Sequence, residues 1–321
     1  MDHHIAAGIL ALVLTLLFLA VKYFRAPRRA MSQRGWAGLG VILLAEVYLV
    51  LHTQGWLSSN EPAIFFTPIV WTGYLLLVDG MVWTLAGHSI ISSTPRRFWL
   101  LVSSSVPLWL IFEAYNLRLE NWAYVGLPAS PWLSGLGYAW SFATIWPAIF
   151  ETADLVRALG IFHRGQSRPW ALSRFSRVSI GLCGLLLVTV PVLVPAHTGQ
   201  YLFGAVWLGF ILLLDPVLRH WKAPSFLLEF EQGETSTLWE FLLAGAVCGI
   251  FWEFWNFWAA AKWLYVFPIG QGSKIFEMPI LGYLGFPAFA LECRVMYEFV
   301  RCLENRILRP RAGHALETAR S

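Results

Sequence analysis

Two copies of one short motif place a carboxylate and a carboxamide three residues apart near the end of a long apolar segment. The two copies consist of Glu113, Asn116, Trp122 and Tyr124, and of Glu253, Asn256, Trp263 and Tyr265. On a helix, side chains three residues apart share a face. The carboxamide would orient the acid for proton transfer or make a helix–helix hydrogen bond. A carboxylate in hydrocarbon is costly unless it faces protein or a wet cavity, so the duplicated motif is the leading candidate site.

The composition places the chain in a membrane. Its 321 residues are 57% hydrophobic and 13% charged, with a mean hydropathy of +0.59. Soluble domains do not combine so high a hydrophobic fraction with so few charges. The formal net charge is +4, and the arginines lie between apolar segments, so no nucleic-acid partner is expected. The four cysteines are scattered and predict small core residues. No metal spacing or cofactor motif occurs, so we expect neither a metal nor a cofactor.

Nine apolar runs are long enough to cross the bilayer, which takes about 20 helical residues. The first covers residues 5–24, and the others are centred near residues 45, 75, 107, 145, 187, 209, 248 and 290. The chain is therefore predicted to be an all-α polytopic membrane protein, whose partners are the lipid bilayer and a lipophilic small molecule.

The arginines predict the orientation, because short cytoplasmic loops are enriched in Lys and Arg. Basic connections at residues 25–34, 96–97, 157–177 and 219–222, with the tail from residue 301, alternate with nearly uncharged ones. This pattern predicts a multi-pass protein of the cell membrane with the N-terminus outside and the C-terminus in the cytoplasm. Lys262 and Lys274 lie in one predicted outer loop, against the trend.

The duplication extends beyond the motif, since Gly73 and Asp79 match Gly209 and Asp215 at the same spacing. We predict an N-terminal anchor and basic loop (1–34), a first four-helix repeat (35–160), a basic linker (161–176), a second four-helix repeat (177–304) and a basic tail (305–321). An even number of helices in each unit makes the two repeats parallel, with matched helices facing each other.

Acidic residues inside the apolar runs come in matched pairs. Descent of the two halves from one unit explains this pairing as well as a catalytic role does. The candidate catalytic residues are Glu253, Glu113, Glu292 and Glu151. The candidate substrate-binding residues are Asn116, Asn256, Tyr115, Trp122, Trp252, Trp255, Trp263, Arg294, Asp79 and Asp215. Arg294 would be a counter-ion to an acid or an anchor for an anionic group, with its partner on another helix.

Aromatic residues make up 16% of the chain, and many lie next to these acids. Trp122 and Trp263 fit an interfacial belt, whereas Trp252 and Trp255 flank Glu253 at depth. Aromatic faces stabilise cations, and removal from water favours the protonated acid. Acids among aromatic rings therefore suit protonation of an alkene followed by stabilisation of the resulting cation.

The order of acid, spacer, Trp-x-Tyr and then Pro in the next helix resembles the lycopene cyclase domain of small membrane-embedded carotenoid cyclases. The resemblance covers 113–151 and 253–298. It implies an isomerase of carotenoid biosynthesis that protonates a polyene and closes a ring without redox change, with Glu113 and Glu253 where the family has Asp. The family's Pro-x-Glu-Glu pair is absent after Pro279, where the chain has Ile280, Leu281 and Gly282.

The sequence therefore favours a membrane enzyme acting on an isoprenoid or other lipid by proton-initiated cyclisation or isomerisation. Parallel repeats with acids at their interface also describe proton-coupled transporters and lipid-handling proteins. A structural subunit of a membrane complex is a third reading, and the sequence leaves the oligomeric state open.

The alternation of basic connections predicts that the segments around Gly126 and Gly270 lie on the same, outer side of the membrane. Cysteines introduced there should react with a membrane-impermeant maleimide from the same side. Labelling from opposite sides would contradict the parallel arrangement of the repeats.

Overall fold

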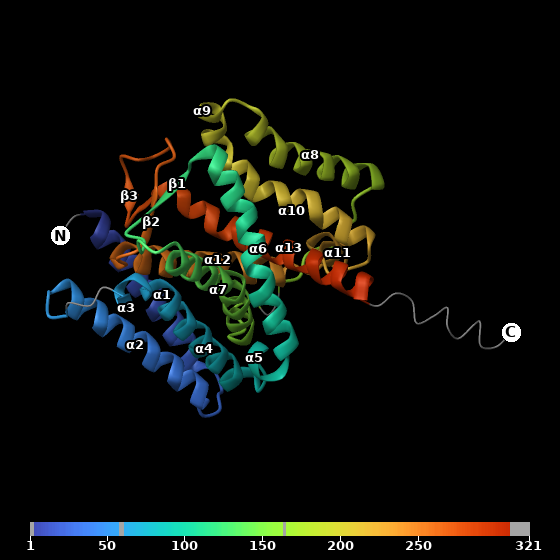
Figure 1. Ribbon diagram of the computed structural model, residues 1–321. Helices are drawn as coiled ribbons and strands as arrows, with labels where there is room; N and C mark the ends of the chain where they lie inside the picture. The colour runs from blue at the N-terminus through green and yellow to red at the C-terminus, as the bar shows by residue number, and fades with distance from the viewer. Residues whose placement is uncertain (1–2, 58–60, 163–164, 309–321) are drawn as a thin grey trace.

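The computed structural model describes residues 3–57, 61–162 and 165–308, and its long helices cover every predicted apolar run (Figure 1). The long helices are α1 (His3–Arg25), α2 (Gln33–Thr53), α4 (Phe66–Ala86), α6 (Pro95–Leu119), α7 (Pro131–Ala158), α8 (Arg174–Leu193), α10 (Phe203–His220), α12 (Ser236–Trp258) and α13 (Gly285–Leu308). Residues 309–321 of the predicted tail and 163–164 of the predicted linker lie outside the described residues.

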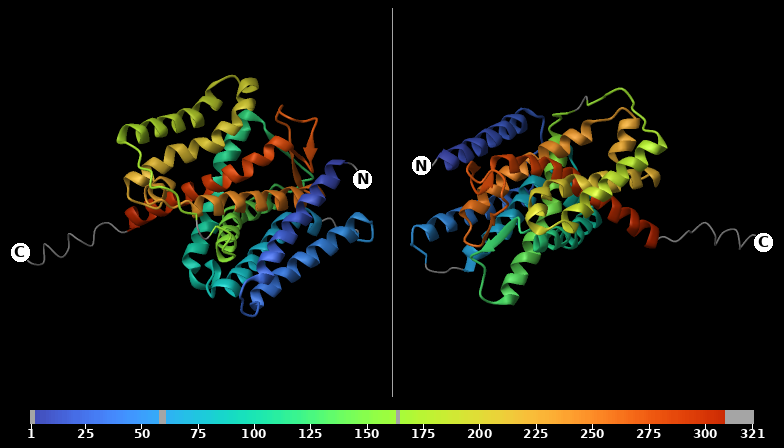
Figure 2. Two further views of the ribbon diagram at one scale, coloured as in Figure 1. Left: turned by 180° about the vertical axis from the view of Figure 1, so that it is seen from behind. Right: turned by 90° about the horizontal axis from the view of Figure 1, so that it is seen from above.

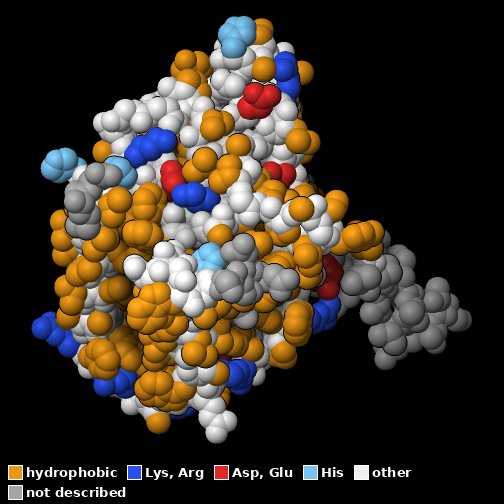
Figure 3. All heavy atoms as spheres, turned by 60° about the vertical axis from the view of Figure 1, so that its left-hand side comes forward, with side chains coloured by type: hydrophobic (Ala, Val, Ile, Leu, Met, Phe, Trp, Pro, Cys, Tyr) orange, Lys and Arg blue, Asp and Glu red, His pale blue; other side chains and the backbone are white. Residues whose placement is uncertain are grey.

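Seven helices of the described chain are long and apolar enough to cross a membrane. They are α1, α2, α4, α6, α8, α10 with the turn that precedes it, and α12. Tryptophan, tyrosine and small polar residues lower the hydropathy of α7, and charged residues interrupt α13. Hydrophobic side chains cover most of the face seen in Figure 3. The chain is a multi-pass membrane protein with an all-α fold.

Two helix pairs lie on opposite sides of the bundle, α2 with α4 and α8 with α10 (Figures 1 and 2). A glycine permits close approach in each pair. A Cβ added at Gly38 would lie 2.4 Å from the nitrogen of Leu77, and one at Gly184 would lie 2.3 Å from the nitrogen of Leu213. Small residues let membrane helices pack closely by van der Waals contact, so the two pairs use the same packing device.

The two Trp-x-Tyr segments pair with each other as antiparallel strands. In the pairing of β1 (Trp122–Val125) with β2 (Lys262–Tyr265), Trp122 lies opposite Tyr265 and Tyr124 opposite Trp263. These segments were predicted to be loops. They lie together at one end of the bundle, here called the sheet end. Gly126 has a φ of 70°, and a Cβ there would lie 2.0 Å from the oxygen of Ala260. The half-exposed Leu127 and Ile269 are thus better positions for cysteine labelling.

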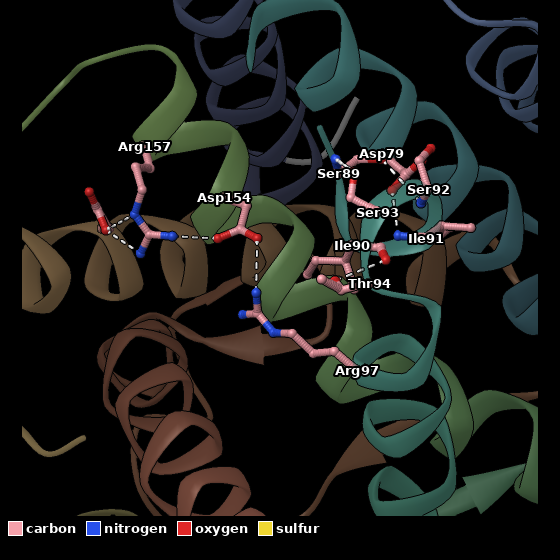
Figure 4. A network of polar contacts seen from close by, with 11 residues as sticks. Asp79, Ser89, Ile90, Ile91, Ser92, Ser93, Thr94, Arg97, Asp154 and Arg157 are labelled. Carbon is pink, nitrogen blue, oxygen red and sulfur yellow. Dashed lines mark hydrogen bonds and ion pairs between the residues drawn. The ribbon is translucent and has the colours of Figure 1, made fainter. Parts of the chain in front are cut away.

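Ion pairs gather at the other end of the bundle, here called the arginine end. Figure 4 shows Arg97 and Arg157 on either side of Asp154, at 3.7 and 2.6 Å. Arg157 also contacts Glu240 at the start of α12, at 2.7 Å. Further pairs join Arg96 to Glu304, Arg177 and Arg219 to Glu231, and Arg294 to Glu229. The basic connections predicted to lie on one side therefore meet at one end.

The matched aspartates Asp79 and Asp215 each bind the start of a short helix at the arginine end. Asp79 accepts the amide of Ile91 in α5 (Ile90–Ser93) at 2.9 Å. Asp215 accepts the amides of Phe226 and Leu227 in α11 (Phe226–Glu231) at 2.8 and 2.9 Å. The first amides of a helix lack partners within it, so both carboxylates act as caps. These contacts give a structural reason for the matching positions of Asp79 and Asp215 in the two halves.

We expect Asp215→Ala to lower the free energy of unfolding by roughly 1–3 kcal/mol, because it leaves two buried amides without acceptors. Thermal unfolding in detergent, followed by circular dichroism, measures this loss. Asp215→Asn keeps one acceptor oxygen and should lose less. Equal stability of Asp215→Ala and wild type would mean that the cap contributes nothing.

Candidate functional site

A cavity of about 520 Å³ lies near the sheet end, enclosed by elements from both halves of the chain. Its wall comes mainly from α4, α6, β1, α7, α10, α12, β2, η2 (Ile280–Leu284) and α13. The aromatic rings that line it belong to Phe65, Trp71, Trp109, Trp122, Tyr124, Tyr138, Phe142, Tyr201, Phe203, Trp207, Trp252, Trp263, Tyr265, Phe267, Phe286 and Phe289. Its volume falls in the range of about 300–1,000 Å³ that small-molecule pockets occupy.

Lys262 is the only charged residue among the described residues that line the cavity. Its ammonium group contacts a Glu277 oxygen at 2.7 Å and the carbonyl of Phe257 at 3.2 Å. Its charge is therefore balanced within the protein. A wall of this kind matches an apolar ligand, because a charged ligand would lose its hydration without a counter-charge.

Glu113 lies directly behind the cavity wall and is held by three residues of that wall. One carboxylate oxygen, Oε1, accepts hydrogen bonds from Trp109 Nε1 at 2.8 Å, Trp122 Nε1 at 3.3 Å and the Tyr124 hydroxyl at 2.6 Å. Trp109 comes from α6, and the other two donors come from β1. Hydrogen bonds to a carboxylate are among the stronger ones in proteins, so the acid and its three donors form one fixed unit.

Glu253 occupies the matching place in the second half with fewer donors. Its Oε1 accepts the Tyr265 hydroxyl at 2.7 Å, and this hydroxyl in turn accepts Trp263 Nε1 at 2.8 Å. Glu253 is fully buried, and its Oε2 makes no hydrogen bond of normal geometry within the described chain. In each half, a tyrosine hydroxyl of the sheet thus joins an acid to the cavity wall; Glu253 is buried and Glu113 is partly exposed.

Asn116 and Asn256 fix the strands rather than the acids. Asn256 donates to the carbonyl of Trp263 at 2.9 Å and accepts the amide of the same residue at 3.0 Å. Asn116 makes the same pair of bonds to Trp122, at 2.9 and 3.0 Å, and also accepts the amide of Asn121. Neither the expected contact with the neighbouring Glu nor a helix–helix bond is found. Each carboxamide instead brackets a strand tryptophan, the first residue of β1 and the second of β2.

The remaining predicted binding residues divide between the cavity and other sites. Trp252 lines the cavity. Trp255 donates to Glu46 of α2 at 2.7 Å, and Tyr115 donates to the carbonyl of Val188 at 2.7 Å. Arg294 pairs with Glu229 of α11 and lies over the Phe226 ring, so its partner does come from another helix. With Asp79 and Asp215, these three residues belong to packing contacts outside the cavity.

Glu151 on α7 and Glu292 on α13 are completely buried but do not line the cavity. Neither carboxylate makes a hydrogen bond of normal geometry within the part of the chain that the structure describes. The structure thus does not bring them together with Glu113 and Glu253 in one site.

Tyr124 and Tyr265 line the cavity but were not listed among the candidate catalytic or substrate-binding residues. Both belong to the duplicated Trp-x-Tyr motif, and that repetition was the available signal. Glu46 was also missed, although it is the only acid in its apolar helix. Its link to Trp255 bridges α2 and α12, which no spacing within one helix could indicate.

Within the described residues, no group of three or more His, Cys, Asp or Glu side chains could hold a metal ion. The cysteines are free; Cys248 and Cys293 are buried, as predicted for core residues, whereas Cys183 is exposed and Cys302 partly exposed, so the prediction was wrong for Cys183. Comparison with protein-family models, curated proteins and solved structures finds no match for this chain. The geometry of the site therefore carries the functional argument.

The two cavity tyrosines should make the protein sensitive to alkali. Burial raises the pKa of Tyr265 and of Tyr124 well above the ordinary value, and the adjacent Glu253 and Glu113 raise each pKa further. Above about pH 10 the unfolded chain therefore loses protons that the folded protein keeps, so stability falls as pH rises. We expect the melting temperature to drop less steeply above that pH in a Tyr124→Phe/Tyr265→Phe variant.

The control is Tyr201→Phe, which removes an exposed hydroxyl at the cavity edge. It should keep the alkaline slope of the wild type. An unchanged slope in the double variant would show that these hydroxyls do not govern the alkaline transition.

Proposed function

We propose that the chain is an integral membrane enzyme that isomerises or cyclises an apolar, unsaturated lipid by proton transfer. The observation that carries this proposal is that two tyrosines, one from each half, line a single aromatic cavity and hydrogen-bond through their hydroxyls to a glutamate of the same half. Carboxylic acids and tyrosines are common general acids and bases. A substrate without charge fits this wall, and a protonated double bond needs the aromatic surfaces around it.

The proposed reaction begins at Glu253 and ends at Glu113. The Tyr265 hydroxyl, which donates to Glu253 in the structure, turns to the substrate and gives its proton to one carbon of the double bond, while protonated Glu253 replaces that proton on the tyrosine oxygen. The resulting carbocation lies among tryptophan faces, where it isomerises or closes a ring. A neighbouring carbon then loses a proton to Tyr124, which passes its own to Glu113. One proton is gained and one lost, so the product is an isomer of the substrate and no oxidant is needed.

The number of donors supports this assignment of roles. The Oε1 of Glu113 accepts three hydrogen bonds, which suits the anion that receives a proton. Glu253 receives one donor and keeps a buried oxygen without a hydrogen bond of normal geometry, which suits an acid that carries a proton. Such acids are placed to contribute about 10²–10⁴-fold to the rate.

The contacts between the two halves favour this enzyme over a carrier that rocks between two states. At the sheet end β1 pairs with β2, and at the arginine end Arg157 of α7 pairs with Glu240 of α12. A rigid-body movement of one half against the other would break one of these links. Alternating access needs such a movement, whereas a fixed cavity does not.

The same proposal includes the finer details of the fold. We infer that α7 and α13 also cross the membrane, giving nine spans, and that residues 35–160 and 177–304 are parallel repeats. The paired strands, the two asparagine brackets and the two aspartate caps support this reading. With the arginine end in the cytoplasm, the sheet end and the N-terminus lie outside.

The resemblance to the lycopene cyclase domain agrees with this chemistry, since that family also joins membrane carboxylates to an apolar polyene. The family's Pro-x-Glu-Glu pair has no counterpart here, and in its place this chain offers Tyr124 and Tyr265 as the groups that meet the substrate. We therefore propose a carotenoid-cyclase-like isomerase with an isoprenoid substrate of its own.

The test of this function is turnover of a linear isoprenoid polyene by membranes that contain the protein, assayed in D₂O. An isomeric product should form with deuterium incorporated at carbon. Glu253→Gln keeps the shape of the side chain but removes the transferable proton, so the rate should fall on the order of 100-fold. Tyr265→Phe should have a similar effect because it removes the hydroxyl that faces the substrate.

Glu120→Gln is the matched control, because Glu120 is exposed at the end of α6. It should retain the wild-type rate. Size-exclusion chromatography checks that each variant is folded. Full activity in folded Glu253→Gln, or a product without deuterium at carbon, would contradict the proposed reaction.

A further inference from the structure

The cavity reaches the lipid-facing surface between α10 and the segment that leads from η2 into α13. Three leucines line the cavity and are nevertheless exposed. They are Leu208 on α10, exposed by 49%, and Leu281 and Leu284 on η2, exposed by 64 and 72%. A side chain that both lines a cavity and is exposed lies at its rim. This part of the rim is built from leucine side chains, which suits contact with hydrocarbon.

Two glycines widen the same part of the rim. Gly204 lies one turn before Leu208, and Gly285 directly follows Leu284; both line the cavity. A Cβ added at either glycine would meet no atom within 4 Å, so both positions border open space. Deeper in the bundle, the rings of Trp207 and Phe289 stand 5.1 Å apart and join α10 to α13. The opening therefore has a defined inner limit.

We propose that the rim formed by Leu208, Leu281 and Leu284 around Gly204 and Gly285 is a lateral portal through which a long-chain lipid enters the cavity from the bilayer. This inference rests on the proposed function and names its substrate class. The reacting end of the chain lies at Tyr124 and Tyr265, while the remainder extends through the portal between α10 and α13 into the bilayer.

The energetics of transfer favour this route over one from water. Each CH₂ group that passes through water loses the favourable free energy of its apolar burial, so the cost of that route rises with every carbon of the chain. Sideways entry avoids this cost. Lys262 is already paired with Glu277, so the cavity offers no unpaired cation for an anionic headgroup. The part of the lipid inside the cavity is therefore its apolar chain.

The portal can be tested with a fatty acid that carries a photoactivatable diazirine near the end of its chain. The full-length protein is placed in phosphatidylcholine vesicles with this probe and irradiated, and labelled peptides are identified by mass spectrometry. In the wild type, label should appear on cavity residues such as Phe142, Ile145 and Phe286. Gly204→Phe and Gly285→Phe place a ring in the opening, and cavity labelling should fall about tenfold, which corresponds to an added barrier of about 1.4 kcal/mol.

The matched control is Gly135→Phe, because Gly135 is also an exposed glycine with open space around it but does not line the cavity. It should leave cavity labelling unchanged. Label on the lipid-facing side chains of α8 should be the same in every variant, which checks that each protein is folded and in the bilayer.

The outcomes separate the portal from the proposed function. Undiminished cavity labelling in folded Gly204→Phe and Gly285→Phe would overturn the portal alone. Isomerase activity on the polyene would then still support the proposed function. Cavity labelling obtained only with a short-chain diazirine acid added from water would also overturn the portal, since the entrance would then face the aqueous side. A wild-type cavity that takes up neither probe would overturn the portal and remove support for a lipophilic substrate.

Discussion

The bracket that each asparagine makes around a strand residue is the interaction on which the site depends. Asn116 and Asn256 satisfy both backbone groups of Trp122 and Trp263. Two residues later, each strand presents a tyrosine to the acid of its own helix. Because unpaired backbone groups cost several kcal/mol in hydrocarbon, this short sheet can exist near the membrane only with such side-chain partners. The distance between helix and strand is thereby fixed, and with it the Glu–Tyr contact.

The same requirement explains where the other polar residues lie. The aspartates bind helix amides at the arginine end, and the arginines of the connections find acids on neighbouring helices. Arg157 lies between Asp154 and Glu240, so it links α7 to α12. Both ends of the bundle are therefore tied by polar contacts. Aromatic side chains pack in the middle of the bundle, and the cavity lies between its two ends.

Helices were predictable because each depends on local hydropathy alone, and every expected apolar run lies in a long helix. The motif also named residues that the structure brings together, since Trp122 and Trp263 line one cavity and Glu113 and Glu253 bond to residues of its wall. What the sequence could not provide was the pairing of β1 with β2, because these segments are separated by about half of the chain and have little regular strand pattern. Without that pairing, the asparagines were expected either to orient the neighbouring acids or to bond between helices, and Tyr124 and Tyr265 were not listed among the candidate binding residues.

The two halves differ most where the chemistry is proposed. In the first half three donors converge on one oxygen of Glu113; in the second, Trp263 donates to the Tyr265 hydroxyl rather than to Glu253. One of the two missing donors follows from residue 109, a tryptophan whose place one turn before Glu113 corresponds to Gly249 before Glu253. Gly249 has no side chain to donate, and the Phe286 ring lies against its backbone instead. A single difference between matched helices thus removes a donor from one acid and gives the two members of the pair different hydrogen-bonding states.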